Sequence, residues 1–349
     1  MIRVLVAEDS PTARVLLISM LQSDPSIIVI GQATTGLEAV EMTERLAPDL
    51  VTMDVEMPEL DGLGATEQIM MRRPTPIVVI SAQANERAVD LSLEATRAGA
   101  LTVLPKPGGP SDDGFAAQRA ALIATVKAMA EVKVVRRWRA RRTRHVTPVP
   151  KGLRVAPTKI RLIAIGASTG GPAAVRDLLS VLPASFPAPI LLVQHIAKGF
   201  VRGLVHWVNA ETRLNVSLAE DGVIARAGCV YVAPDDHHLG VEVRGTGGQP
   251  RIALSSAAPI GTFRPSATWL FESVARALGP SAAGLIMTGM GDDGVAGLRA
   301  VRAAGGTVIA QDETSSIVYG MPREAVRAGV VNSVVSLSDL PQHLLDLVS

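Results

Sequence analysis

The sequence predicts two successive α/β units, each built on a mainly parallel sheet. The chain has 349 residues, which is long for one compact domain and sufficient for two. Hydrophobic residues make up 48% of the chain and aromatic residues only 3%, so the cores must be aliphatic. Short apolar runs alternate with helical patterns in both halves, as in parallel sheets whose strands are covered by helices on both faces.

The first 107 residues alternate strand and helix signals at a regular spacing. Apolar runs typical of strands start near Val4, Ile27, Leu50, Ile77 and Leu101. Helical patterns lie between these runs, for example over 36–46 and 85–98. Ser10 followed by Pro11 is typical of a helix N-terminus. Five βα units of this size predict a doubly wound parallel sheet.

Residues 108–158 interrupt this alternation. A Gly-Gly-Pro loop is followed by a predicted helix over about 113–135 and then by a linker over 136–158 that contains several prolines. The end of the helix and the start of the linker carry a basic run of Lys133, Arg136, Arg137, Arg139, Arg141, Arg142 and Arg144. We interpret this run as a solvated tether. Contact of this run with an acidic partner is an alternative, and nucleic-acid binding is a further one, although Trp138 is the only aromatic residue within the run.

Residues 159–349 contain the signals of a second α/β unit. Strands are predicted over 161–165, 189–195, 229–233, 283–288 and 307–310. Helices are predicted over 172–182, 265–278, 295–304 and 338–348. The glycine-rich stretch 229–255 predicts an inserted hairpin.

The composition argues against several classes of protein. The net charge is +1, so no strong field indicates a nucleic-acid partner. Cys229 is the single cysteine, which we expect to be buried; it cannot form an internal disulfide and suits a reducing cytoplasm. No apolar run approaches the ~20 residues needed to cross a bilayer, and the N-terminal run is too short for a signal peptide. We therefore expect a cytoplasmic protein that is not inserted in a membrane.

A first candidate site lies at the strand ends of the N-terminal unit. Its residues are Glu8, Asp9, Asp54, Ser81 and Lys106. The carboxyl ends of parallel strands share one edge of the sheet, so these side chains should converge. Crowded carboxylates need a cation, and their oxygens suit Mg²⁺. Asp54 could then attack a phosphoryl group whose charge the metal and Lys106 neutralise.

The segments VAEDS, MDVEMPELDG, ISA and LPKP resemble those of a receiver domain, with the flavodoxin-like fold of that family, over residues 1–107. The resemblance implies phosphorylation of Asp54 and magnesium bound by Glu8, Asp9 and Asp54. It also implies a switch hydroxyl at Ser81, a phosphate contact from Lys106 and a cis bond before Pro107. One departure is Val103, which stands where receivers usually carry an aromatic switch residue.

A second candidate site begins at Ser168, in the Gly-Ala-Ser-Thr-Gly-Gly loop between a predicted strand and helix. Gly-x-Ser-x-Gly at such a turn is typical of a nucleophile elbow. A nucleotide-binding glycine loop is the alternative, although the G-x-G-x-x-G spacing is missing. His195 ends the next predicted strand, and Asp292 and Asp293 follow a later one. A serine nucleophile needs such a base and an orienting carboxylate.

The other histidines leave alternatives open. His237 and His238 compete for the role of base, or could ligate a metal within Pro-Asp-Asp-His-His. His206 lies in a helical pattern and is expected to be packed or solvated. The spacing alone cannot choose between Asp292 and Asp293. The chain order Ser, His, Asp differs from that of the α/β-hydrolases, which indicates a separate origin for the same geometry.

The motifs GASTGG, QHI, GMGDDG, RPSAT and YGMPREA resemble the CheB family of chemotaxis methylesterases, with a Rossmann-like catalytic domain over 159–349. The resemblance implies that Ser168 is the nucleophile, His195 the base and Asp293 the orienting carboxylate. The backbone N–H of Met290 would hold the oxyanion.

The same resemblance implies the reaction and the partners. The substrates would be glutamate γ-methyl esters of methyl-accepting chemoreceptors, hydrolysed with release of methanol. Receptor glutamines would be deamidated by the same chemistry. A chemosensory histidine kinase would phosphorylate a receiver that otherwise covers the active site. A non-enzymatic, phosphorylation-dependent scaffold is the alternative function.

Overall fold

The computed structural model describes residues 1–81, 94–96, 98–112, 114–132, 159–245 and 248–349. The chain divides into two units, Met1–Arg141 and Arg142–Ser349, each with its own parallel sheet. The division falls within the expected linker at 136–158, which lies outside the described residues, as does the basic run. Most of the helix expected over 85–98 also lies outside them.

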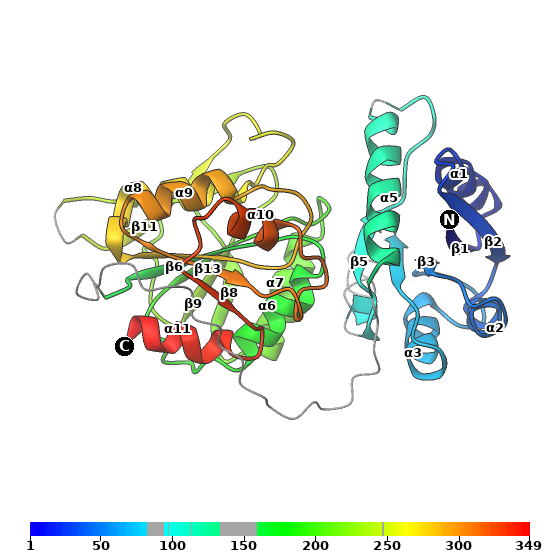
Figure 1. The fold of residues 1–349 in the computed structure, drawn as a ribbon, viewed down its shortest axis with the longest axis horizontal. Helices are drawn as coiled ribbons and strands as arrows, with labels where there is room; N and C mark the ends of the chain where they lie inside the picture. The colour runs from blue at the N-terminus through cyan, green and yellow to red at the C-terminus, as the bar shows by residue number, and fades with distance from the viewer. Residues whose placement is uncertain (82–93, 97, 113, 133–158, 246–247) are drawn as a thin grey trace. The chain divides into compact units, whose positions relative to one another are not determined.

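The N-terminal unit is a five-stranded parallel sheet in the order β2-β1-β3-β4-β5. Its strands are β1 (Ile2–Ala7), β2 (Ile27–Ala33), β3 (Leu50–Asp54), β4 (Ile77–Ser81) and β5 (Thr102–Pro105). Helices α1 (Pro11–Gln22) and α5 (Phe115–Ala130) pack together on one face, and α2 (Gly36–Leu46) and α3 (Gly62–Arg72) on the other (Figure 1). This is the doubly wound sheet that the sequence predicts.

Local chemistry explains where these elements begin. Every residue of β3 and β4 is buried, as expected for central strands covered on both faces. Ser10 caps α1 by accepting a hydrogen bond from the Ala13 N–H at 3.4 Å, and Pro11 is the first helical residue. Helix α5 begins after Gly114, two residues later than the predicted start at 113, and ends at Ala130. The last residues of the predicted helix, 133–135, lie outside the described residues.

The C-terminal unit is a seven-stranded parallel sheet in the order β14-β13-β12-β6-β7-β9-β8. Its strands are β6 (Leu162–Ala167), β7 (Ile190–Gln194), β8 (Asn215–Leu218), β9 (Cys229–Val232), β12 (Ala282–Ile286), β13 (Thr307–Gln311) and β14 (Ser333–Val335). One face carries α8 (Ala267–Leu278), α9 (Val295–Ala303) and α10 (Met321–Arg327); the other carries α6 (Gly171–Ser180), α7 (Val201–Glu211) and α11 (Leu340–Val348) (Figure 1). A 3₁₀ turn, η1 (Gly279–Ser281), leads into β12. No helix in the described part of the chain is long and apolar enough to span a membrane.

Strand β6 lies at the point where the strand order of this sheet reverses. The chain runs from β6 to β7 on one side and later returns to β12 on the other. Ligand sites in open parallel sheets form beyond the carboxyl ends of strands at such a point. The loops after β6, β7 and β12 therefore surround the natural place for a site.

Three expectations need correction. The hairpin consists of β10 (His238–Val243) and β11 (Pro250–Ser255), whereas Cys229–Val232 belongs to the main sheet, because an apolar run does not specify its pairing partner. Cys229 is partly exposed, since it is the first residue of its strand. The cis peptide found in the described residues is Arg264–Pro265 and not Lys106–Pro107; the two isomers of an X-Pro bond differ by only ~0.5–1 kcal/mol, so sequence cannot choose.

Candidate active site

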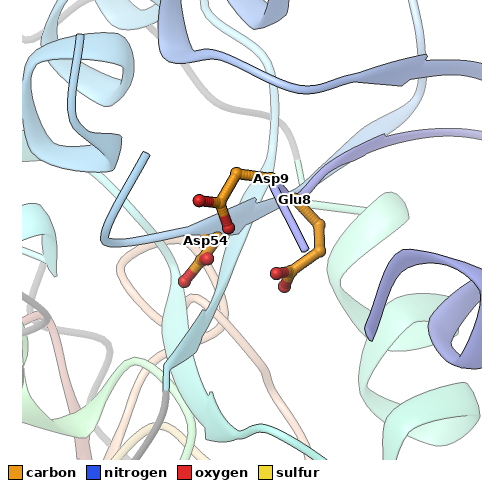
Figure 2. Close-up of side chains that lie close together, drawn as sticks. All are labelled: Glu8, Asp9 and Asp54. Atoms are coloured by element: carbon orange, nitrogen blue, oxygen red, sulfur yellow. The ribbon is translucent and has the colours of Figure 1, made fainter. Parts of the chain in front are cut away.

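Three carboxylates meet at the carboxyl edge of the N-terminal sheet, as Figure 2 shows for Glu8, Asp9 and Asp54. One oxygen of each lies within 4.8 Å of the others. Glu8 and Asp54 are buried and Asp9 is exposed, so the cluster opens to solvent on one side. Because like charges repel at this separation, the cluster needs compensating positive charge.

Lys106 supplies part of that charge. Its Nζ lies 2.7 Å from Asp54 Oδ2 and 2.9 Å from Glu8 Oε1. Burial raises the pKa of both carboxyls more than these contacts lower it. Burial lowers the pKa of Lys106, but its bonds to Asp54 and Glu8 outweigh that effect and raise it. The buried Ser81 accepts the Lys106 backbone N–H at 2.9 Å, which holds the lysine segment at the strand end.

The cluster fits a hard cation. Glu8 Oε2 is buried and has no hydrogen-bond partner among the described residues, which is costly for a carboxylate oxygen. Among the described residues, Asp54 Oδ1 accepts one hydrogen bond, from the backbone N–H of Val55 at 2.7 Å. Oxygen donors with unused lone pairs are the ligands that magnesium prefers.

Gly62 and Arg14 contact the backbone carbonyls of two residues of this cluster. A Cβ on Gly62 would lie 2.0 Å from the Asp54 carbonyl oxygen, so α3 can start against β3 only with glycine there. Arg14 donates from Nη1 to the Glu8 carbonyl at 2.7 Å. Arg14 was not predicted to belong to this site, because a contact with a backbone carbonyl six residues earlier leaves no signal in the sequence. Val103 is partly buried and packs against the core of this unit.

Ser168 sits on a tight turn directly after β6. Its N–H donates to the Thr288 carbonyl at 3.0 Å, and its carbonyl accepts the Gly171 N–H at 2.8 Å. A Cβ on Gly289 would lie 2.7 Å from Ser168 Cβ, so the loop after β12 approaches the serine only because residue 289 is glycine. The Ser168 side chain is partly exposed, and its hydroxyl makes no hydrogen bond to any described residue.

His195 follows β7, and its Nε2 lies 2.9 Å from Asp293 Oδ2. Their side chains are 10% and 4% exposed, so solvent barely screens the contact. The ring stacks on Phe263 at a centroid distance of 4.2 Å and an interplanar angle of 10°. Nε2 lies close to Asp293, but neither ring nitrogen of His195 meets the angular criteria for a hydrogen bond to a described residue. Apo sites often have such loose geometry.

Asp293 is held by the N-terminus of α8. Oδ1 accepts the Ser266 hydroxyl at 2.7 Å and the Thr268 N–H at 3.1 Å, and Oδ2 accepts the Ala267 N–H at 2.7 Å. Burial alone would raise the pKa of Asp293, but the contact with His195 and the bonds from Ser266 and Ala267 lower it well below the usual range. Asp292 is exposed. The buried acid is therefore the one that can orient a histidine.

The side chain of Gln194 links the serine and histidine loops. Its Nε2 donates to the Ser168 carbonyl at 2.7 Å and to the His195 carbonyl at 2.9 Å. Gln194 lies in the QHI motif, but no role was predicted for its side chain. Met290 follows Gly289 and is partly exposed, and its N–H bonds to no acceptor in the described residues.

His206, His237 and His238 do not take the place of His195 beside Asp293. His237 is exposed, and His238 is buried against Ser266 and Ala258. The described residues contain one cluster with metal-ligand spacing, that of Glu8, Asp9 and Asp54, so the expected alternative of a metal at His237 and His238 has no support. His206 is exposed on α7, in line with its expected solvated role.

Comparison with known proteins bears on both units. Residues 4–112 match the family model of the response regulator receiver domain, and residues 163–344 match that of the CheB methylesterase. A Myxococcus xanthus protein is 53% identical over 344 residues, which cover 98% of this chain and 96% of that protein. It is named protein-glutamate methylesterase/protein-glutamine glutaminase 4. The chain belongs to the CheB methylesterase family.

Other CheB proteins are also similar to this chain. An Anaeromyxobacter dehalogenans protein of the same name, numbered 3, is 49% identical over 99% of this chain and 98% of its own length. The crystal structure of the Thermotoga maritima CheB methylesterase catalytic domain is 35% identical and superposes with a TM-score of 0.52, covering 54% of this chain and all of that one. The CheB relatives are named as enzymes, so the scaffold alternative has no support from them.

Proposed function

We propose that this protein is a phosphorylation-regulated serine esterase that hydrolyses glutamate γ-methyl esters on the cytoplasmic helices of chemoreceptors. The observation that carries the proposal is that Ser168 and His195 follow the adjacent strands β6 and β7 at the reversal point of the C-terminal sheet, with Asp293 2.9 Å from His195. Whole-chain similarity to proteins named protein-glutamate methylesterase supports the substrate class.

The proposed reaction has two steps. Ser168 Oγ attacks the γ-carbonyl carbon of the methylated glutamate, and His195 takes the hydroxyl proton and returns it to methanol as the C–O bond breaks. Water then attacks the acyl-serine, again with His195 as base, and releases glutamate and Ser168. Since Nε2 of His195 faces Asp293, Nδ1 is the nitrogen that remains for the serine proton.

Charge that develops during the reaction needs two partners. Asp293 stays ionised because its pKa is lowered, so it can stabilise the imidazolium form of His195 without taking the proton itself. The unbonded N–H of Met290 is our candidate for the oxyanion. Attack on a receptor glutamine would follow the same steps with ammonia as the leaving group, which would make the protein a glutaminase as well.

We propose that the N-terminal unit accepts a phosphoryl group on Asp54 from a chemosensory histidine kinase. Glu8, Asp9 and Asp54 would hold Mg²⁺, which would neutralise charge on the phosphoryl oxygens. Lys106 would move from its present bonds with Asp54 and Glu8 to a phosphoryl oxygen, and Ser81 would supply the switch hydroxyl. Both partners, the kinase and the receptor helices, imply action in the cytoplasm.

The deciding experiment measures methanol release from methyl-esterified receptor membranes, with and without a small phosphodonor. Replacement of Ser168 by Ala should abolish release, because loss of a triad nucleophile costs on the order of 10⁶-fold in turnover. Cys229→Ala, a change at the start of β9, is the matched control and should leave release unchanged. No release by the parent chain under either condition would contradict the proposal.

A further inference from the structure

His238 is a fully buried histidine that the proposed reaction does not use. It opens β10 and is 0% exposed. Its ring stacks on Trp269 of α8 with a centroid distance of 4.6 Å and an interplanar angle of 15°. A buried imidazole needs partners for both nitrogens, and these partners define what the residue holds in place.

One ring nitrogen of His238 faces a hydrogen-bond donor and the other faces an acceptor. The backbone N–H of Ser266 donates to Nδ1 at 3.3 Å, and Nε2 lies 3.1 Å from the carbonyl oxygen of Ala258. Only the neutral tautomer with its hydrogen on Nε2 satisfies both contacts. The ring therefore acts as an acceptor for the residue that begins α8.

Ser266 connects His238 to Asp293 in the candidate active site. It is 0% exposed and caps α8, and its hydroxyl donates to Asp293 Oδ1 at 2.7 Å. The next two residues donate their backbone N–H groups to the same carboxylate. Thr268 also accepts the Gly294 N–H at 2.8 Å, which ties the aspartate loop back to the helix. The position of Ser266 thus sets the position of the Asp293 carboxylate.

An unbroken series of contacts therefore runs from the hairpin to the base: His238 to Ser266, Ser266 to Asp293, and Asp293 to His195 at 2.9 Å. Small displacements of a catalytic group lower rates strongly, because the reacting atoms must be aligned within a fraction of an ångström.

We propose that His238 is a positioning residue for the esterase: by accepting the Ser266 N–H, it orients Asp293 and through it His195. This inference rests on the proposed function, since it assigns His238 a role in that same reaction.

Three variants separate the contacts of the ring. His238→Phe keeps the stacking on Trp269 and the volume but removes both polar contacts. In His238→Asn the amide reaches the place of Nδ1 and can still accept the Ser266 N–H. In His238→Gln the amide reaches the place of Nε2 and can meet only Ala258. The Asn and Gln variants lose the stacking equally, so their difference isolates the link to Ser266.

The measurement is kcat and KM for methanol release from methylated receptor membranes by the full chain. We expect kcat of the Phe and Gln variants to fall on the order of 10- to 100-fold with KM within about twofold of the parent, the size expected for a misplaced catalytic group. The Asn variant should recover most of the kcat.

Ser273→Ala is the matched control, because Ser273 joins the same helix to the same hairpin through bonds of 2.8 and 3.1 Å to Val241 and lies away from Asp293. It should lower the Tm without changing kcat or KM. Equal kcat in the Asn and Gln variants, or a Phe variant that behaves like Ser273→Ala, would overturn the inference while the parent stays active. An inactive parent would overturn the proposed function, and this inference with it. If the Phe variant does not fold, the Asn and Gln pair decides.

Discussion

Asp292 and Asp293 are neighbours in the chain but differ in the properties that the proposed reaction needs. Asp292 is exposed, whereas Asp293 is buried and accepts three hydrogen bonds from the start of α8. A carboxylate can stabilise an imidazolium only if it stays ionised and in place. Hydrogen bonds from the start of α8 therefore determine which of the two acids is held beside His195. The residues of α8 precede both acids in the sequence.

A second residue-scale effect concerns pH and Asp24. Hydrogen bonds from the side chain and backbone of Ser26, together with Lys127 at 3.0 Å, lower the pKa of Asp24 to about 2. Since the folded pKa lies below the ordinary value of about 3.9, the charged group contributes stability that is present above about pH 4 and lost as pH falls toward 2.

We expect Asp24→Asn to lower the Tm of the N-terminal unit at pH 7 by a small amount, because solvent screens the pair. Calorimetry between pH 7 and pH 3 should show the difference from the parent shrinking as pH falls. Lys127→Ala is the comparison, since it removes the ion pair and keeps the Ser26 bonds. A Tm difference between variant and parent that grows toward pH 3 would contradict a stabilising role for the ionised Asp24.

At the scale of elements, hydrogen bonds at helix N-termini fix where the helices beside both candidate sites begin. Asp61 caps α3 by accepting the Gly64 N–H at 2.8 Å, and α3 begins against the Asp54 carbonyl. Ser266 caps α8 in the same manner and at the same time binds Asp293. In both units a capped helix start thus lies beside a residue of the proposed chemistry.

Removal of the α3 cap should have a defined cost. Asp61→Ala leaves a helix N–H without its partner, so the free energy of unfolding of the N-terminal unit should fall by about 1 kcal/mol. Asp61→Asn keeps an acceptor and should lose much less. Calorimetry is the suitable measurement, because two of the three tryptophans, Trp207 and Trp269, lie in the C-terminal unit and their fluorescence would report on that unit instead. Equal losses in the two variants would argue against the cap.

At the scale of the whole molecule, the chain combines a phosphoacceptor unit and an esterase unit, each with its own sheet. If the unphosphorylated receiver covers the active site, the coupling between the units should be of the usual allosteric size, about 1–3 kcal/mol.

Deletion of the residues up to Val155 should therefore raise methanol release from methylated receptors by roughly 5- to 150-fold over the unphosphorylated full chain. A phosphodonor should raise release by the full chain in the same direction, and Asp54→Asn should abolish that stimulation while leaving basal release. Ser168→Ala in the shortened chain controls for other esterases. Unchanged release after the deletion would count against a covering receiver.

Much of the fold and of the candidate sites was predictable from local sequence. The five strands of the N-terminal unit begin within a residue or two of the predicted apolar runs, and Ser168, His195 and Asp54 lie at strand ends as predicted. This works because strand and helix periodicity, caps and glycine turns depend on near neighbours in the chain.

Contacts between distant segments had no such signal. The motifs that contain Gln194 and Ser266 were visible, but their roles as the bridge between two loops and as the anchor of Asp293 were not. The pairing of β9 with the main sheet, rather than with the hairpin, was likewise open.

The sequence by itself determined the two α/β units, the family resemblance and the identities of the candidate active-site side chains, because each follows from residue type and short-range spacing. Only the tertiary structure decided which acid faces His195, which histidine is buried behind Ser266, and which ring nitrogen of His195 faces Asp293. The physical reason is that hydrogen-bond direction and burial depend on how α8 packs against β10 and on where the loop after β12 meets the start of that helix, and packing between elements has no period in the sequence.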